Sequence, residues 1–368
     1  VEIYRGLHKT SIKHITPRHE QGAGFMADGY SRVSGKPAVC LVITGPGLTN
    51  ILTALAQARA DSIPMLIISS VNPYDNKRKI SGLLHELPNQ QKLLKKIAIS
   101  SLTVKKTKDL IPAIKKSFLK MLEERPGPVH IEIPTNLLNY KPQKLKKNDL
   151  YIKKKKIKSS EKEINEVLNY LTYAKYPVLL LGGGARGCDE YILKIVEKLS
   201  PYVITTINAR GILGDHSMCI PASPTLKTVR KELKKADIVL AVGTEFGETD
   251  YDMYKDGNFP KLKKLIRVDI NKNQLTKNIQ PHLSIRSDAI YFFKKLSEIL
   301  MVKKHYKKSS LQTPQTAKII RKLCLSEIEP KFKVPLNLIS TISSNFPDAI
   351  LVGDSTQPTY AGNLYTKT

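Results

Sequence analysis

The sequence predicts an α/β protein made of consecutive doubly wound, parallel-sheet domains. Short apolar runs such as 38–43 and 178–181 are typical of strands covered on both faces. Each of these runs leads into a glycine-rich turn and then into a segment with helical spacing of its apolar residues. Near the start of the chain, strands and helices alternate over about fifty-five residues. Parallel strands joined by right-handed crossovers produce this alternation.

The first elements follow one another closely. Residues 11–16 alternate apolar and polar side chains, which predicts a half-buried strand. Pro17 ends it because proline has no N–H for the ladder. A helix is expected from Glu20, with Gly35 as its C-cap. The next three elements are expected to be a buried strand over 38–43, a helix over 48–60 and a strand over 65–68.

Several spaced motifs fall between residues 17 and 64. They are His19–Gly24, Ala27–Arg32, Gly35–Pro37, Thr44–Asn50 and Ala60–Pro64. Together they resemble the pyrimidine-binding domain of the thiamine diphosphate enzymes related to acetolactate synthase. Several motifs in one register are hard to obtain by chance.

The resemblance implies a catalytic role for Glu20. In the family, the matching glutamate hydrogen-bonds N1′ of the cofactor's aminopyrimidine and favours the imino tautomer, whose 4′-nitrogen deprotonates thiazolium C2. Gly45, Pro46, Gly47 and Asn50 match the cofactor-binding residues around the ring, and glycine lets backbone approach a flat ligand. Burial beside apolar walls would raise the pKa of Glu20. The structural alternative is a glutamate that interacts favourably with a helix N-terminus.

Composition restricts the function classes. The formal charge is +28, but most of the excess is lysine, arginine is the minority cation and tryptophan is absent. Solvated lysine-rich faces are therefore expected, with a nucleic-acid-binding protein as the alternative from another class. The four cysteines form no CxxC pair, which favours a cytoplasmic protein without a zinc site. No apolar stretch has the length of a membrane span, so no membrane partner is expected.

The resemblance and the composition together predict a division into parts. The chain is expected to be a fragment of a longer enzyme, truncated at both ends. The expected parts are a pyrimidine-binding thiamine diphosphate domain over 1–140, a linker over 141–160, a Rossmann-like middle domain over 161–301 and the start of the diphosphate-binding domain over 316–368. A buried strand is expected at 349–354. The metal and diphosphate ligands would lie beyond residue 368, so no metal ligand is expected in the chain.

The middle region contains GxGxxG between a strand and a helix, at 182–187. The next strand ends near Thr206 without an acidic residue to hold a ribose, so a structural glycine-rich turn remains the alternative. In the family resembled, this domain binds FAD in some members and ADP or nothing in others. The family's FAD members usually carry a basic residue after the Gly243 strand, whereas 244–250 is acidic here. This difference argues against FAD.

The resemblance implies a reaction but leaves its outcome open. Where acetolactate synthases carry Phe-Gln-Glu, this chain carries Leu84-His85-Glu86, and together with 353–358 this is closer to the branch that decarboxylates 5-guanidino-2-oxopentanoate. A cationic substrate tail needs a carboxylate partner, and Glu86 is the nearest candidate. His85 would approach the 2-oxo group. The alternative for both residues is that they belong to a surface loop that aligns with the family's segment but does not act on the substrate.

The expected function is thiamine diphosphate-dependent decarboxylation of a 2-oxo acid through an enamine intermediate, with Mg²⁺ holding the diphosphate. The alternative is an acetolactate synthase, which joins two 2-oxo acids. A catalytically inactive scaffold is a further alternative, against which the intact Glu20 and Asn50 count. The resemblance also implies a homodimer or homotetramer.

Overall fold

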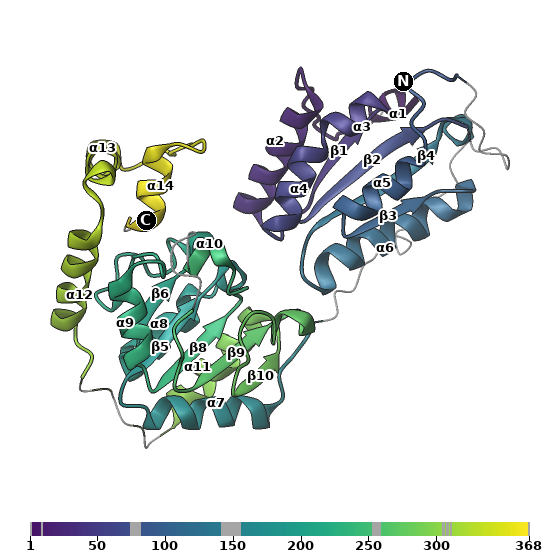
Figure 1. The fold of residues 1–368 in the computed structure, drawn as a ribbon. Helices are drawn as coiled ribbons and strands as arrows, with labels where there is room; N and C mark the ends of the chain where they lie inside the picture. The colour runs from purple at the N-terminus through teal and green to yellow at the C-terminus, as the bar shows by residue number, and fades with distance from the viewer. Residues whose placement is uncertain are drawn as a thin grey trace. The chain divides into compact units, whose positions relative to one another are not determined.

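The computed structural model describes residues 2–8, 10–73, 82–140, 156–251, 259–303, 306, 309 and 311–366. The chain divides into two compact units, residues 1–156 and 157–368 (Figure 1). Most of the predicted linker 141–160 lies outside the described residues. The four predicted domain boundaries stay predictions.

The first unit contains a four-stranded sheet in the order β1-β2-β4-β3, and its paired strands run parallel. The strands are Ala38–Val42 (β1), Met65–Val71 (β2), Ser100–Thr103 (β3) and Pro128–Pro134 (β4). The helices are Glu2–Leu7 (α1), Glu20–Ser34 (α2), Pro46–Asn50 (α3), Leu52–Ala60 (α4), Gln90–Ile97 (α5) and Leu110–Glu123 (α6), with 3₁₀ turns at Thr107–Asp109 (η1) and Thr135–Leu137 (η2).

Both faces of this sheet are covered by helices. Successive side chains of a strand point to opposite faces. Met65 and Ile67 of β2 accordingly pack in one apolar cluster with Leu55 of α4. Leu66 packs in a second cluster with Met121 of α6. The predicted doubly wound arrangement is confirmed for this unit (Figure 1).

Several of the predicted elements of this unit are confirmed. The helix from Glu20 ends at Ser34, and Gly35 follows in the left-handed conformation with φ 67°. The strand predicted at 65–68 is β2. The helix predicted over 48–60 is two helices, because the chain bends at Ile51 between α3 and α4.

Three expectations about strands are wrong. β1 is present but is not buried on both faces, because Val39 is 51% exposed. Residues 11–16 form no strand, and Ile15 is 75% exposed. Residues 349–354 also form none, and Val352 is 93% exposed. A strand is stable only when its backbone groups pair, and no described strand pairs with either segment.

The second unit contains a six-stranded sheet in the order β10-β9-β8-β5-β6-β7, again with parallel pairing. Its strands are Pro177–Leu181 (β5), Tyr202–Thr205 (β6), Cys219–Ile220 (β7), Ile238–Val242 (β8), Leu265–Asp269 (β9) and Leu283–Arg286 (β10). Its helices are Glu161–Tyr173 (α7), Asp189–Leu199 (α8), Lys227–Lys235 (α9), Glu248–Tyr251 (α10), Ala289–Val302 (α11), Pro314–Glu327 (α12), Pro330–Asn345 (α13) and Gln357–Leu364 (α14). Short 3₁₀ turns lie at Gly183–Ala185 (η4), Ile207–Ala209 (η5) and Lys272–Gln274 (η6).

The three last helices belong to this second unit. α12 contacts α9 and β7, and it contributes Ala317, Ile320 and Cys324 to the core. α13 packs against α14, and none of its side chains is buried. Residue Tyr365, just after α14, forms an isolated antiparallel bridge with Ala222. The chain from 314 onward is therefore attached to the middle sheet through α12 and through the residues around 365.

Candidate functional site

The candidate site lies at the carboxyl end of β1. Glu20 is the first residue of α2, and Asn50 is the last residue of α3. Asn50 donates a hydrogen bond from Nδ2 to Oε2 of Glu20 over 3.0 Å. The structure thus joins two of the predicted site residues that are thirty positions apart in the sequence. The carboxyl ends of parallel strands are where open α/β sheets bind ligands.

The Asn50 amide also determines the titration of Glu20. Its hydrogen bond holds the pKa of the carboxyl below the ordinary value, because it stabilises the charged form. The sequence predicts a raised pKa for Glu20 only if its carboxyl group is buried beside apolar walls. Glu20 is only half-buried here, so that condition is not met. In this structure the carboxyl group is therefore ionised at neutral pH.

The Gly-Pro-Gly loop adjoins this carboxyl group. Gly45 has φ 66° and ψ −120°, and Pro46 is the first residue of α3. A Cβ added at Gly47 would lie 2.5 Å from Ile43 Cγ2 and 3.3 Å from Glu20 Oε1. A side chain at 47 would therefore clash with Ile43 and press on the Glu20 carboxyl, and glycine avoids both contacts. All five residues predicted for catalysis and cofactor binding are brought together at one edge of the sheet.

The segment after β2 meets the same loop. A Cβ added at Gly45 would lie 2.3 Å from the backbone oxygen of His85. β1 and β2 are parallel neighbours, so the segments that leave their carboxyl ends are adjacent. The exposed His85 contacts the Gly-Pro-Gly loop through its backbone. Residues 74–81, which precede this segment, lie outside the described part of the chain.

The carboxyl group of Glu86 is directed at its own loop. Its Oε2 accepts hydrogen bonds from the backbone N–H groups of Gly82 (2.9 Å) and Leu83 (3.1 Å). Asn72 also fixes this loop by donating to the Leu84 carbonyl over 3.1 Å. This local role of Glu86 does not follow from the sequence alone. The predicted roles of His85 and Glu86 toward a substrate stay predictions.

A buried glutamine beneath the loop was missed by the sequence analysis. Gln90, the first residue of α5, is 2% exposed. Its Oε1 accepts hydrogen bonds from the Thr44 hydroxyl (2.8 Å) and from the Gly45 N–H (3.3 Å). A polar residue at the start of a lysine-rich amphipathic helix resembles a surface residue in the sequence. The pairing of β1 with β2 is what brings it under the loop.

The motif Ala27–Arg32, which this chain shares with the family it resembles, has a structural explanation. Arg32 of α2 pairs with Asp28 one turn earlier and with Asp61 after α4, the latter at 2.6 Å. Ser31 donates to the Pro64 carbonyl over 2.9 Å. These contacts connect α2 to the turn before β2. They keep α2, and with it Glu20, in place against the sheet.

In the second unit, the glycine-rich turn after β5 packs against the end of β8. Gly182 donates its N–H to the Val242 carbonyl over 2.9 Å, and Gly184 donates to Gly243 over 3.1 Å. A Cβ at Gly182 would lie 2.1 Å from the Gly243 oxygen. These glycines are therefore required by backbone packing, as the structural alternative for this turn proposed. The expectation against FAD stays a prediction.

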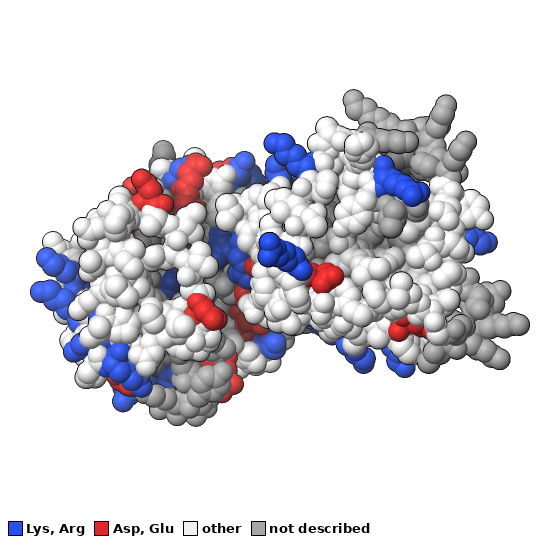
Figure 2. Space-filling model, turned by 90° about the horizontal axis from the view of Figure 1, so that it is seen from above, with Lys and Arg blue, Asp and Glu red and all other residues white. Residues whose placement is uncertain are grey.

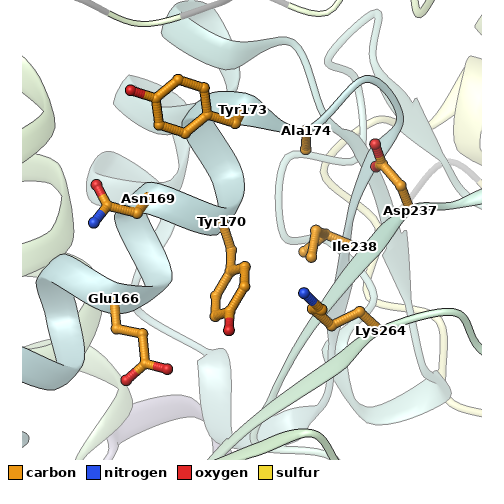
Figure 3. Close-up of a pocket in the computed structure, with 8 residues that line it drawn as sticks. All are labelled: Glu166, Asn169, Tyr170, Tyr173, Ala174, Asp237, Ile238 and Lys264. Atoms are coloured by element: carbon orange, nitrogen blue, oxygen red, sulfur yellow. The ribbon is translucent and has the colours of Figure 1, made fainter.

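The second unit also contains an open groove, shown in Figure 3. Its lining residues are Glu166, Asn169, Tyr170, Tyr173, Ala174, Asp237, Ile238 and Lys264. Lys264 places its ammonium group 4.2 Å from the centre of the Tyr170 ring. Ile238 begins β8 and Lys264 precedes β9, so the groove lies at the amino ends of these strands. This is the edge opposite to the one where such sheets bind ligands.

The surface charge does not form one basic face in the view of Figure 2, where Lys and Arg side chains are scattered among uncharged residues. This distribution agrees with solvated lysines. None of the described helices is both long enough and apolar enough to cross a bilayer. Among the described residues, no three His, Cys, Asp or Glu side chains form a cluster that could hold a metal ion.

Comparison with known protein families matches both units. The thiamine pyrophosphate enzyme N-terminal TPP binding domain matches residues 1–93, and the thiamine pyrophosphate enzyme central domain matches residues 164–296. The chain therefore belongs to the thiamine pyrophosphate enzyme family. The family and the α/β fold predicted from the sequence are confirmed.

Two curated relatives show the branches of the family that are similar to this chain. A probable 2-ketoarginine decarboxylase, AruI, of Pseudomonas aeruginosa is 34% identical over 99% of this chain and 64% of its own length. The acetolactate synthase isozyme 1 large subunit of Escherichia coli is 32% identical over 78% of this chain and 51% of its own length. The chain thus spans between about half and two thirds of these relatives.

A solved structure supports the fold. It is described as the "X-ray structure of a putative thiamin diphosphate-dependent enzyme isolated from Mycobacterium smegmatis". It matches with a TM-score of 0.68 over 81% of this chain and 56% of that chain, at 20% sequence identity.

Proposed function

We propose that the protein containing this chain uses thiamine diphosphate to decarboxylate a 2-oxo acid, and that this acid is 5-guanidino-2-oxopentanoate. The observation that carries the proposal is the Glu20 carboxyl group, held by Asn50 beside the Gly-Pro-Gly loop. The substrate is suggested by the similarity to AruI, since 2-ketoarginine is 5-guanidino-2-oxopentanoate. Mg²⁺ would accompany the diphosphate and would be held outside the described residues.

The residues present fit the ring end of the cofactor. Asn50 binds Oε2 of Glu20, whereas Oε1 faces the position that a Cβ of residue 47 would fill. Glycine at 47 therefore places no side chain against Oε1. Glu20 would bind a ring nitrogen there, and Gly45, Pro46, Gly47 and Asn50 would line the ring.

The chemistry divides between cofactor and protein. When bound, thiamine diphosphate supplies the group that accepts the electron pair left as carbon dioxide departs from a 2-oxo acid. This chain holds and moves a proton. The hydrogen bond from Asn50 lowers the pKa of Glu20 and so favours its charged form. Glu20 would lose water from its carboxyl group beside a bound ring; its pKa would then rise, and it could carry a proton to the ring nitrogen. Asn50 keeps the carboxyl group oriented during this transfer.

The test of this proposal is Glu20→Gln in the complete protein. Glutamine keeps the size of the side chain and its contact with Asn50 but cannot exchange the proton. We expect the decarboxylation rate to fall by about 10²- to 10⁴-fold, the usual contribution of one acid–base group. Glu197→Gln, at an exposed position on α8 of the other unit, is the matched control and should leave the rate unchanged. A near-normal rate for Glu20→Gln would refute the catalytic assignment.

The second candidate function is acetolactate synthesis, favoured by the similarity to the Escherichia coli enzyme. Glu86→Gln helps to separate the two, because the glutamine oxygen can still accept from Gly82 and Leu83 while the charge is lost. If Glu86 binds a guanidinium tail, kcat/KM for 5-guanidino-2-oxopentanoate should fall about tenfold or more relative to pyruvate. Equal losses of kcat/KM for both substrates would mean that Glu86 stabilises its own loop and does not bind the guanidinium tail. Wild-type release of acetolactate from pyruvate would establish the synthase.

We also propose that the complete protein is a cytoplasmic homodimer or homotetramer. The four cysteines are free and buried, as in proteins of a reducing compartment. α2, the helix that begins at Glu20, leaves apolar side chains exposed along its length, among them Met26 at 46% and Val33 at 91%. Another subunit covering them would remove apolar surface from water. Light scattering on Val33→Asp should show dissociation if this face is an interface.

A further inference from the structure

The Gly-Pro-Gly loop is connected to the interior of the sheet through the side chain of Gln90. The amide oxygen accepts two hydrogen bonds from the loop, one from the Thr44 hydroxyl and one from the Gly45 N–H. The side chain is 2% exposed, so water does not compete for these bonds. Buried hydrogen bonds of this kind are costly to lose, because the partners are left unsatisfied.

The other end of the same amide is equally constrained. Its Nε2 donates to Ser69 Oγ, to the Ser70 carbonyl and to Glu132 Oε2, each at 3.1 Å. Glu132 on β4 is 4% exposed, and its Oε1 accepts from the Thr103 hydroxyl over 2.7 Å. Acceptors surround the nitrogen and donors surround the oxygen, so the amide has one satisfactory orientation.

The loop transmits this constraint to the site. The Gly45 carbonyl accepts the N–H of Thr49 over 2.9 Å and so begins α3, the helix that ends at Asn50. Asn50 in turn holds the carboxyl of Glu20. Gly45 has wide conformational freedom as a glycine, and the bond from its N–H to Gln90 restricts this freedom.

We propose that Gln90 is a positioning residue for the cofactor site: by holding the Gly45 N–H, it fixes the loop and α3 so that Asn50 orients Glu20. This inference rests on the proposed function. It assigns Gln90 no contact with cofactor or substrate. Loss of its amide should loosen the loop, weaken thiamine diphosphate binding and lower kcat, while KM for the 2-oxo acid stays close to the wild-type value.

The test compares Gln90→Met with Gln91→Met in the complete protein. Methionine nearly preserves the length and volume of glutamine but removes both hydrogen-bonding groups. Gln91 is the matched control, because it is the next residue of the same helix and its side-chain amide donates to the Ser101 carbonyl over 3.2 Å rather than to the loop. The measurements are amide exchange of the peptide containing Gly45, affinity for thiamine diphosphate with Mg²⁺, near-ultraviolet circular dichroism of the bound pyrimidine, kcat and KM.

We expect Gln90→Met to speed amide exchange at Gly45 tenfold or more, to weaken cofactor affinity about tenfold and to lower kcat by a similar factor. The circular dichroism of the bound pyrimidine should change, whereas Gln91→Met should resemble the wild type in every measurement. Unchanged exchange at Gly45 would overturn the inference, as would faster exchange with unchanged affinity and kcat. Equal effects of both variants would assign Gln90 to helix stability alone. If the wild type binds no thiamine diphosphate, the proposed function fails, and the exchange data still report whether Gln90 holds the loop.

Discussion

Gly45→Ala should destabilise the first unit strongly, because two costs coincide at this residue. The backbone angles φ 66° and ψ −120° lie where only glycine is comfortable, which costs about 1–3 kcal/mol for alanine. The added Cβ would also lie 2.3 Å from the His85 oxygen, so one of the two loops must move by about 1 Å. Overpacking of this kind typically costs about 1–3 kcal/mol.

Taken together, the two costs predict a loss of about 2–6 kcal/mol in the free energy of unfolding. For a unit of this size, that corresponds to a fall of roughly 4 to 24 °C in the melting temperature. The assay is differential scanning calorimetry of the complete protein without cofactor, supplemented by amide exchange to assign the transition to the first unit.

Gly29→Ala is the matched control for this prediction. Gly29 lies in the middle of α2 and is exposed, and an added Cβ there would meet nothing within 4 Å. Alanine favours a helix over glycine by about 0.5–1 kcal/mol, so this variant should melt roughly 1 to 4 °C higher than the wild type. If Gly45→Ala melts within 2 °C of the wild type, the reasoning about the loop contact is refuted.

Three further predictions concern the same unit. His130 is buried on β4, and this burial lowers its pKa from 6.5 to about 3. The unfolded chain therefore binds the proton more tightly than the folded chain, and stability is lost as pH falls below about 6.5. Chemical denaturation between pH 7 and 4 should show a weaker pH dependence for His130→Asn than for the wild type. Asn50→Leu removes the bond that lowers the pKa of Glu20, so the carboxyl resonance of Glu20, followed by NMR, should titrate at a higher pH. Arg32→Met breaks two partly buried ion pairs and should lower the melting temperature by several degrees. The difference between variant and wild type should decrease at high salt, because salt weakens the same ion pairs in the wild type.

The sequence correctly predicted those elements whose local sequence pattern agrees with their surroundings in the fold. The helix from Glu20 combines helical periodicity with a glycine just after its end, and the structure contains both features. Alternation over 11–16 indicated a strand equally well, yet this signal does not report whether a partner strand is present. The apolar run at 349–354 failed for the same reason. A pattern of period two indicates which residues could form a strand, whereas pairing with a partner strand depends on the rest of the chain.

The candidate site was predictable to the extent that its residues belong to short motifs. Glu20, Asn50 and the Gly-Pro-Gly loop lie in such motifs, and the structure brings them together. Gln90 lies in no such motif. Its proximity to Thr44 follows from the parallel pairing of β1 with β2, which places the end of one strand beside the segment that follows the other. The alternation of strands and helices predicts parallel strands, but it does not specify which side chains of later segments lie beneath the loop.

The two glycines of the loop connect the predicted cofactor site to the predicted substrate segment. Gly47 places no side chain against Ile43 and the Glu20 carboxyl, whereas Gly45 allows close approach of the His85 backbone. A shift of the segment around His85 must therefore press on the loop that carries α3 and Asn50. Changes of sequence near His85 that alter substrate preference should then also alter the affinity for thiamine diphosphate. Because the contact is made by backbone atoms, substitutions that keep the backbone conformation should spare the cofactor, and only those that change the positive φ of His85 should affect both.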